Sequence, residues 1–240
     1  MAVVKQVCLL TGASGTLGTA FIERHATAYD IIGVHNSRPL LWPTSDGQCF
    51  IDPLDPSATV AANEHAVRAI PADLSHLDGV RAVVDEVAAH VDRVDVLINC
   101  IGGGTWTHLL SPVALECAAD VFQINALAPL QLTIAVAQRF WRSDVSSNLQ
   151  NNRNVVNISS TAGLVVYPDL GQGLYAGAKA ALNYLTYHMA SDFWDYGIRV
   201  NAVAPNSFPR RVPVNEVLDT VQELVCSQRT GEVVPLFGKQ

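Results

Sequence analysis

A tyrosine and a lysine lie four residues apart in the segment Tyr175-Ala-Gly-Ala-Lys179. In a helix this spacing places a phenol and an ammonium on one face. The positive charge can lower the pKa of the phenol and make it a usable acid near neutrality. Ser159 and Ser160 end the apolar run that precedes this segment, and a hydroxyl there could hydrogen-bond a substrate oxygen. Such a pair is also common on ordinary helix surfaces, so its place in the fold decides its meaning.

A second candidate site is the glycine-rich turn TGASGTLG at residues 11–18, which follows an apolar run and precedes a segment of helical periodicity. Main-chain amides and a helix N-terminus can face an anion in such a turn, and glycines let a pyrophosphate approach closely. Gly12, Gly15 and Gly18 could also serve tight turning and helix packing alone. The strand, turn and helix context favours a nucleotide site. No lysine follows Gly18, which excludes a P-loop.

Strand-like and helix-like segments alternate along the whole chain, which is typical of a parallel sheet with crossover helices. Strands are expected at residues 3–10, 30–35, 67–70, 94–99, 155–159, 199–203 and 232–236, and helices at 16–28, 77–90, 118–142, 174–195 and 214–227. We expect a solvent loop at 143–154, which is rich in Asn and Ser. The predicted fold class is α/β, a doubly wound parallel sheet of about seven strands. It would form a single domain at 1–240, with an insertion at about 39–63 that is rich in Pro, Asp and Ser.

Composition excludes several classes of function. Hydrophobic residues make up 49% of the chain and charged residues 15%, with a formal net charge of −7. The acidic balance and the absence of a basic run predict no nucleic-acid or membrane partner. So few charges leave room for a buried self-association face. Seven dispersed histidines without an HExxH motif predict no metal site. Five scattered cysteines without a CxxC pair indicate reduced core residues of a soluble, cytoplasmic protein, and the N-terminal apolar run is too short for a secretory signal.

Together these segments resemble the classical short-chain dehydrogenase/reductase family. The matching residues are TGASGTLG at 11–18, Asp73-Leu74, NCIG at 99–102, Asn125, NISS at 157–160, YAGAK at 175–179, IRVNAVAP at 198–205 and TGEVVPLFG at 230–238. The resemblance implies a Rossmann fold, a nicotinamide cofactor and a catalytic tetrad of Asn125, Ser160, Tyr175 and Lys179. Ser160 would orient the carbonyl, Tyr175 would donate the proton, Lys179 would hold ribose hydroxyls and Asn125 would anchor a relay water.

The resemblance also implies a set of cofactor-binding residues: Gly12, Ser14, Gly15, Thr16, Leu17, Gly18, Arg38, Asp73, Leu74, Asn99, Gly102, Tyr175, Lys179 and Pro205. Asp73 would meet the adenine through its side chain and Leu74 through its main chain, while Asn99 would brace the sheet edge. The second strand ends in His35-Asn36-Ser37-Arg38, with no acid to accept from a ribose 2′-hydroxyl. Arg38 can pair with a 2′-phosphate, so we predict that NADP(H) is preferred over NAD(H).

Several positions depart from the family pattern. Thr16 stands where the middle glycine of the motif is expected, Ile101 replaces the usual alanine, and Asn206 replaces a glycine. The segment at about 206–214, where the substrate lid is usually built, is short. A shortened lid predicts an open cleft that suits a bulky or carrier-tethered substrate. The insertion at 39–63 could cover such a cleft or could decorate the adenine-side edge of the sheet.

The sequence therefore predicts an NADP(H)-dependent oxidoreductase that reduces a small-molecule ketone to an alcohol, or the reverse. An imine or activated-alkene reductase on the same fold is an alternative, and so is a dinucleotide-sensing protein without turnover. A serine hydrolase is disfavoured because Ser14 lacks the GxSxG elbow. The two long helices at 118–142 and 174–195 predict a homodimer or homotetramer, because family members pair through these helices.

Overall fold

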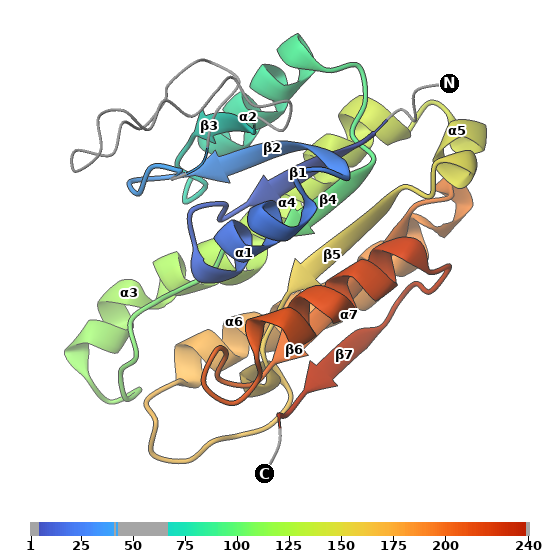
Figure 1. Cartoon of the computed structure of the whole chain (residues 1–240). Helices are drawn as coiled ribbons and strands as arrows, with labels where there is room; N and C mark the ends of the chain where they lie inside the picture. The colour runs from blue at the N-terminus through green and yellow to red at the C-terminus, as the bar shows by residue number, and fades with distance from the viewer. Residues whose placement is uncertain (1–4, 41, 43–66, 239–240) are drawn as a thin grey trace, which may run out of the picture.

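The computed structural model describes residues 5–40, 42 and 67–238. These residues form one parallel sheet of seven strands in the order β3-β2-β1-β4-β5-β6-β7 (Figure 1). The strands are β1 Gln6–Thr11, β2 Tyr29–His35, β3 Arg68–Pro71, β4 Val96–Asn99, β5 Asn154–Ile158, β6 Arg199–Pro205 and β7 Val233–Leu236. The predicted fold class, a doubly wound Rossmann-type sheet of about seven strands, is confirmed.

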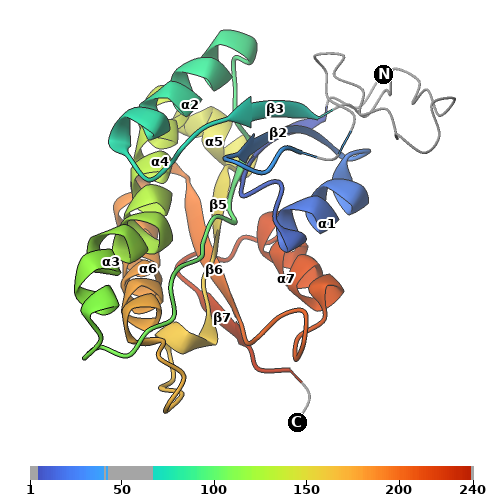
Figure 2. The ribbon, with the colours of Figure 1, turned by 90° about the vertical axis from the view of Figure 1, so that its left-hand side faces the viewer.

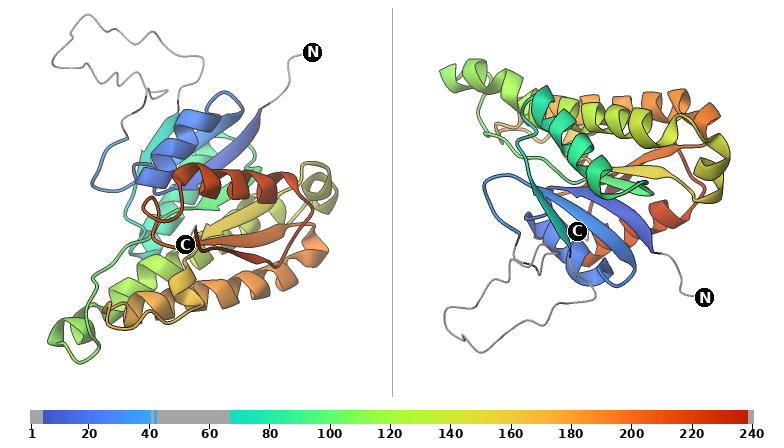
Figure 3. Two further views of the ribbon diagram at one scale, coloured as in Figure 1. Left: turned by 60° about the horizontal axis from the view of Figure 1, so that its bottom comes forward. Right: turned by 90° about the horizontal axis from the view of Figure 1, so that it is seen from above.

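Helices cover both faces of the sheet, as Figure 2 shows. One face carries α1 Thr16–His25 and α7 Val214–Cys226, and the other carries α2 Leu77–His90, α4 Ala128–Val136 and α6 Gly173–Asp192. The helix α3 Pro112–Phe122 leads into α4 and packs beside α6. Figure 3 shows the same layers from two further directions.

The apolar runs of the strands account for this layering. Along β1, Val7 and Leu9 belong to the core under α2, α4 and α6, whereas Cys8 and Leu10 belong to the core under α1 and α7. Successive side chains of a strand point to opposite faces, so a strand buried on both faces is expected to be largely apolar. This pattern makes the strands easy to predict from sequence.

The long helix expected at 118–142 begins earlier and is irregular. It runs from Pro112 to Trp141 and includes two π-helical turns, η1 Gln123–Leu127 and η2 Ala137–Trp141. Proline suits the first turn of a helix, where its missing N–H is not needed. Among the described residues this one helical stretch is long and apolar enough, by length and composition, to cross a membrane. Its inner side packs on the sheet, where Leu132 and Trp141 are fully buried.

The solvent loop predicted at 143–154 is wrong, because this segment contains the short helix α5 Val145–Gln150. The side chain of Asp144 caps the helix by accepting a hydrogen bond from the Ser147 amide at 2.8 Å. Asn148 is buried and donates to the carbonyls of Trp141 and Tyr196 at 2.7 and 2.9 Å. Asp144 thus caps the helix, and Asn148, one of the residues that suggested a loop, instead donates to two main-chain carbonyls.

Two expectations concern residues that are not described or only partly described. Of the insertion predicted at about 39–63, only residues 39, 40 and 42 are described. Cys49 lies outside the described residues. The cysteines that are described have free thiols. Cys8 is buried, but Cys226 is exposed, so the prediction of core cysteines is wrong for Cys226.

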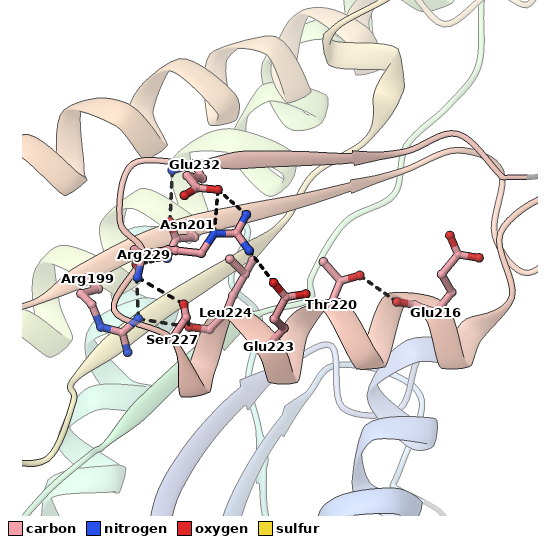
Figure 4. A network of polar contacts seen from close by, with 9 residues as sticks. All are labelled: Arg199, Asn201, Glu216, Thr220, Glu223, Leu224, Ser227, Arg229 and Glu232. Carbon is pink, nitrogen blue, oxygen red and sulfur yellow. Dashed lines mark hydrogen bonds and ion pairs between the residues drawn. The ribbon is translucent and has the colours of Figure 1, made fainter.

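A polar network holds the amino ends of the last strands (Figure 4). Arg199, at the start of β6, donates to the carbonyls of Leu224 and Val225 at the end of α7, both at 3.1 Å. Arg229 forms ion pairs with Glu223 at 2.7 Å and with Glu232. These contacts attach α7 and β7 to the edge of the sheet opposite the candidate site, which lies at the carboxyl ends of the strands.

Candidate functional site

The glycine-rich turn joins β1 to α1 at the carboxyl edge of the sheet, where the strand order changes direction between β1 and β4. Gly12 adopts a φ of +65°, and a Cβ at this position would lie 2.8 Å from the Cys100 carbonyl oxygen. This position therefore requires glycine. Gly15 is the N-cap of α1, no side chain caps the first turn, and that turn has no acidic residue. The free amides and the positive end of the helix dipole can therefore receive an anion.

Side-chain contacts join the ends of β1, β4 and β5 beneath this turn. The hydroxyl oxygen of Thr11 accepts hydrogen bonds from the amides of Cys100 and Ile101 at 3.1 and 3.2 Å. The amide nitrogen of Asn99 donates to Asn157 Oδ1 at 2.9 Å and to Thr133 Oγ1 at 3.1 Å. Asn99 is fully buried. It braces the sheet edge, as the sequence led us to expect.

A hollow of about 250 Å³ lies beside the turn. Of the predicted cofactor residues, it is lined by Gly12, Ser14, Gly15, Arg38 and Leu74. Arg38 is exposed at its edge, after the end of β2. The hollow therefore brings the glycine-rich turn together with Arg38, the only arginine among the described residues of its wall.

The other predicted cofactor residues of this region do not line that hollow. Leu17 and Gly18 are buried in α1, and Thr16 is exposed at its first position. Asp73 is exposed next to the hollow, and its carboxylate accepts a hydrogen bond from the Ser75 amide at 2.9 Å. This hydrogen bond is the main reason that the pKa of Asp73 is lowered.

A second hollow, of about 290 Å³, contains Ser160 and Tyr175 and extends to Pro205 at the end of β6. Ser160 follows β5, and its hydroxyl oxygen accepts a hydrogen bond from the Ala162 amide at 3.1 Å. Tyr175 lies in the first turn of α6. Ser159 is buried and donates to the Lys179 carbonyl at 3.4 Å, so Ser160 is the serine with the more accessible hydroxyl.

The electrostatics of Tyr175 and Lys179 differ from the expectation. Burial raises the pKa of Tyr175, and a hydrogen bond with Ser160 opposes this effect only in part. Lys179 Nζ lies 5.8 Å from the centre of the Tyr175 ring and donates to the Ile158 carbonyl at 2.9 Å. Burial lowers the pKa of Lys179 itself to about 8. The predicted lowering of the Tyr175 pKa by Lys179 is therefore wrong here, because burial is the dominant effect.

Asn125 lies in the π-helical turn η1, whose wider spacing interrupts the long helix. Its Oδ1 accepts from the Gly103 amide at 3.1 Å, and its Nδ2 donates to the carbonyls of Val121 and Gly103 at 2.9 and 2.5 Å. A Cβ on Gly102 would lie 3.1 Å from Asn125 Oδ1 and 3.2 Å from Lys179 Nζ. The structure thus brings Asn125, Gly102 and Lys179 together, and Lys179 lies on the same helix as Tyr175. Irregular π turns are frequent at functional sites.

The wall of the second hollow also includes Trp106 and residues of two segments, 164–174 and about 206–214, that the sequence links to substrate selection without assigning a role to any one residue. They are Trp106, Tyr167, Leu170, Gln172, Asn206, Ser207, Phe208 and Arg211. They come from three separate loops, after β4, after β5 and after β6. No motif connects them in the sequence, so only their loop positions could have suggested them.

Residues 53–213 match the family model for short chain dehydrogenases. The chain belongs to the short-chain dehydrogenase family. It is accordingly an oxidoreductase of this family, and the matched residues include the candidate tetrad. The glycine-rich turn lies before the matched segment.

Curated relatives of this short-chain dehydrogenase include several reductases. A 3-oxoacyl-(acyl-carrier-protein) reductase from a Synechocystis species is 26% identical over 237 residues, which cover 99% of this chain and 88% of that protein. A protein of the same name from Thermotoga maritima is 28% identical over 241 residues, with 98% and 85% covered. Glucose 1-dehydrogenase 2 from Bacillus subtilis is 24% identical, with 98% and 83% covered.

Solved structures agree with this assignment. A short chain dehydrogenase from Mycobacterium smegmatis superposes with a TM-score of 0.77 at 26% identity, covering 98% of this chain and 93% of that one. An oxidoreductase of the same family from Brucella ovis, in complex with a partially ordered NAD, gives a TM-score of 0.70 at 28% identity, with 98% and 100% covered.

Proposed function

We propose that this short-chain dehydrogenase is an NADP(H)-dependent carbonyl reductase that converts a small-molecule ketone to an alcohol, or works in reverse as an alcohol dehydrogenase. The observation that carries the proposal is that Ser160 and Tyr175 line one hollow at the carboxyl edge of the sheet. Their hydroxyl groups can meet the same carbonyl oxygen there. Lys179 Nζ lies 5.8 Å from the centre of the Tyr175 ring, and Asn125 and Lys179 both lie beside Gly102.

The described residues fit a dinucleotide. The left-handed Gly12, the uncapped N-terminus of α1 and the exposed Arg38 surround the first hollow, and they suit a pyrophosphate and a phosphorylated ribose. The nicotinamide, when bound, supplies or accepts the hydride. Each turnover of reduction consumes one hydride and one proton and yields the alcohol and the oxidised dinucleotide.

The protein residues handle the proton and the oxygen. Ser160 would donate a hydrogen bond to the substrate oxygen as negative charge develops on it. Tyr175 would supply the proton from its phenol. Burial raises the pKa of this phenol, so it carries a proton at neutral pH that it can give to the substrate oxygen during reduction. Lys179 would bind ribose hydroxyls, and Asn125 would hold a water that returns a proton to the site.

The experiment that tests the reaction is NADPH consumption with a panel of ketones, quinones, imines and activated alkenes. We expect ketone reduction by the wild type and a loss of turnover of at least about 1000-fold in Tyr175→Phe, because the proton donor is gone. NADPH binding should persist in this variant. Tyr184→Phe is the matched control, because Tyr184 is an exposed tyrosine on the same helix.

Several outcomes would contradict this function. Undiminished turnover in Tyr175→Phe would refute the assigned proton donor. Reduction of imines or alkenes without reduction of ketones would place the chain in one of those reductase classes. NADPH binding without turnover of any compound would favour a dinucleotide-sensing protein.

Cofactor preference rests on Arg38. No acid ends β2, and the guanidinium at the edge of the first hollow would pair with a 2′-phosphate. We expect Arg38→Ala to lower the ratio of NADPH to NADH affinity by about tenfold or more. Arg81→Ala serves as the control, because Arg81 is exposed on α2 and pairs with Asp78. Equal binding of NADH and NADPH by the wild type would contradict the preference.

We also propose that the chain forms a homodimer or homotetramer through the helical stretch Pro112–Trp141 and α6. Apolar side chains remain exposed on these helices, among them Leu115 at 86% exposure and Tyr184 at 66%. Trp141 does not contribute, because it is fully buried and its indole donates to the Val94 carbonyl at 2.7 Å. Sedimentation should show a species of at least twice the 25.8-kDa chain mass. A monomer at micromolar concentration would contradict this proposal.

We also propose that the cover over the second hollow is short and leaves the cleft open. Residues 206–213 connect β6 to α7 and form the described part of the cover after β6. A short cover favours substrates that extend out of the site, which a series of ketones of increasing size tests. Clearly better kcat/KM for the smallest ketones would contradict an open cleft.

The free thiols of the described cysteines suit the reducing cytoplasm, where we place the protein.

A further inference from the structure

The hollow that contains Ser160 and Tyr175 has one charged side chain among its described lining residues, that of Arg211. The remaining lining residues are neutral, and no described Asp or Glu belongs to the wall. Arg211 is exposed and takes part in none of the ion pairs among the described residues. In a chain of net charge −7, this leaves an uncompensated positive charge beside the reacting groups.

The main chain around Arg211 is firmly attached. The Arg211 amide donates to the Ser207 carbonyl at 2.9 Å, and the Asn206 amide donates to the Leu236 carbonyl at 2.8 Å. Gly238, with a φ of +78°, packs so closely on the Arg211 carbonyl that a Cβ there would clash. The loop after β6 is thus held against the segment after β7. The main chain of Arg211 is therefore held in place, while its guanidinium stays free to bind a ligand.

We propose that Arg211 binds an anionic group of the substrate, so that the enzyme selects carbonyl compounds that carry a carboxylate or a phosphate. This inference rests on the proposed carbonyl reduction. A guanidinium pairs with both anions through parallel N–H donors. Trp106, Leu170 and Phe208 line the same hollow and would contact the hydrocarbon part of such a substrate.

Two classes of substrate combine a carbonyl with an anionic group. One is a short oxo acid with a free carboxylate, and the other is an oxoacyl thioester of phosphopantetheine with its phosphate. The hollow of about 290 Å³ can hold a short oxo acid whole, whereas the thioester would extend out past the short cover after β6. The two are distinguished by separate arms of one experiment.

The first arm compares 4-oxopentanoate and 5-oxohexanoate with their methyl esters, and the second compares the 3-oxobutanoyl thioesters of phosphopantetheine and pantetheine. We expect wild-type kcat/KM to be at least about tenfold higher for the acids than for their esters, as charge-assisted hydrogen bonds provide. Arg211→Gln should abolish this ratio, mainly through KM for the acids, and Arg211→Lys should retain part of it. Arg210→Gln is the control, because Arg210 is exposed but does not line the hollow.

A preference confined to the phosphorylated thioester, and lost in Arg211→Gln, would support the anion site and identify phosphate as its ligand. Equal kcat/KM for charged and neutral partners in both arms would overturn the inference, and so would an unchanged ratio in Arg211→Gln. If either of these outcomes were found while neutral ketones were still reduced, the proposed function would remain supported and only the anion site would fail.

If no compound is reduced, the proposed function fails, and the inference is tested by binding instead. Calorimetry can measure the binding of 4-oxopentanoate and of its methyl ester to the protein in the presence of NADPH. The wild type should bind the acid more tightly than the ester, and Arg211→Gln should not. Equal binding would overturn the inference independently of turnover.

Discussion

Replacing Lys179 by methionine is expected to stabilise the folded chain at neutral pH while it damages the site. Lys179 is 2% exposed, and its Nζ donates to the Ile158 carbonyl at 2.9 Å. Burial penalises the ammonium and lowers the pKa of Lys179 from 10.5 to about 8. Methionine has a similar length, carries no charge and adapts to irregular apolar surroundings.

The expected gain follows from this pKa. At about 1.4 kcal/mol for each tenfold change in acidity, the protonated form of the buried lysine is disfavoured by roughly 3 kcal/mol. Methionine removes this penalty but leaves the Ile158 carbonyl without its donor, which costs about 1 kcal/mol. We therefore expect the free energy of unfolding to rise by about 2 kcal/mol at pH 7.

The pH dependence has a defined sign. The folded-state pKa of Lys179, about 8, lies below the value of 10.5 for the unfolded chain. Between these two values the unfolded chain binds a proton that the folded chain does not bind, so this group makes the wild type more stable as pH rises. Below about pH 8 the full penalty is present. The advantage of methionine should therefore be complete at pH 7 and should shrink as pH rises through 8 toward 10.5.

Urea unfolding followed by tryptophan fluorescence, at one protein concentration and without dinucleotide, would measure this difference at pH 7 and pH 9.5. Lys5→Met is the control, because Lys5 is only partly buried and its amine donates to a carbonyl at 3.4 Å. A Lys179→Met variant less stable than the wild type at pH 7 would refute the reasoning. A stability difference that is the same at both pH values would refute it as well.

Three further substitutions test the fold at and away from the site, each by chemical denaturation. Gly12→Ala should cost about 2 kcal/mol, because its φ of +65° is strained for alanine and the new Cβ meets the Cys100 carbonyl; stability equal to wild type would show that the turn is not constrained. Asp95→Asn should cost about 3 kcal/mol, because it leaves the buried Arg153 without its ion-pair partner; a loss below about 1 kcal/mol would show that Arg153 reaches water. Asp144→Ala should cost about 1 kcal/mol through loss of the cap on α5, and Asp144→Ser should recover most of that.

The sequence predicted the elements whose side-chain pattern repeats over many residues. The continuous apolar run of β1 is long enough to indicate a strand buried on both faces. The helix α5 was missed because its six residues, Val145–Gln150, complete fewer than two turns and show no periodicity. The π turn that carries Asn125 leaves no sequence signal, because one additional residue in a helix changes the spacing only locally.

For the site, the sequence by itself determined that Tyr175 and Lys179 share a helix and that Ser160 follows the preceding strand, because spacing and strand order are properties of the chain. The tertiary structure decided the rest. It determined that burial raises the pKa of Tyr175, because desolvation depends on the groups packed around the phenol. It also placed Arg211 in the wall of the hollow. The main chain at Arg211 is positioned by its contact with Gly238, a residue that is distant in sequence from most of the site.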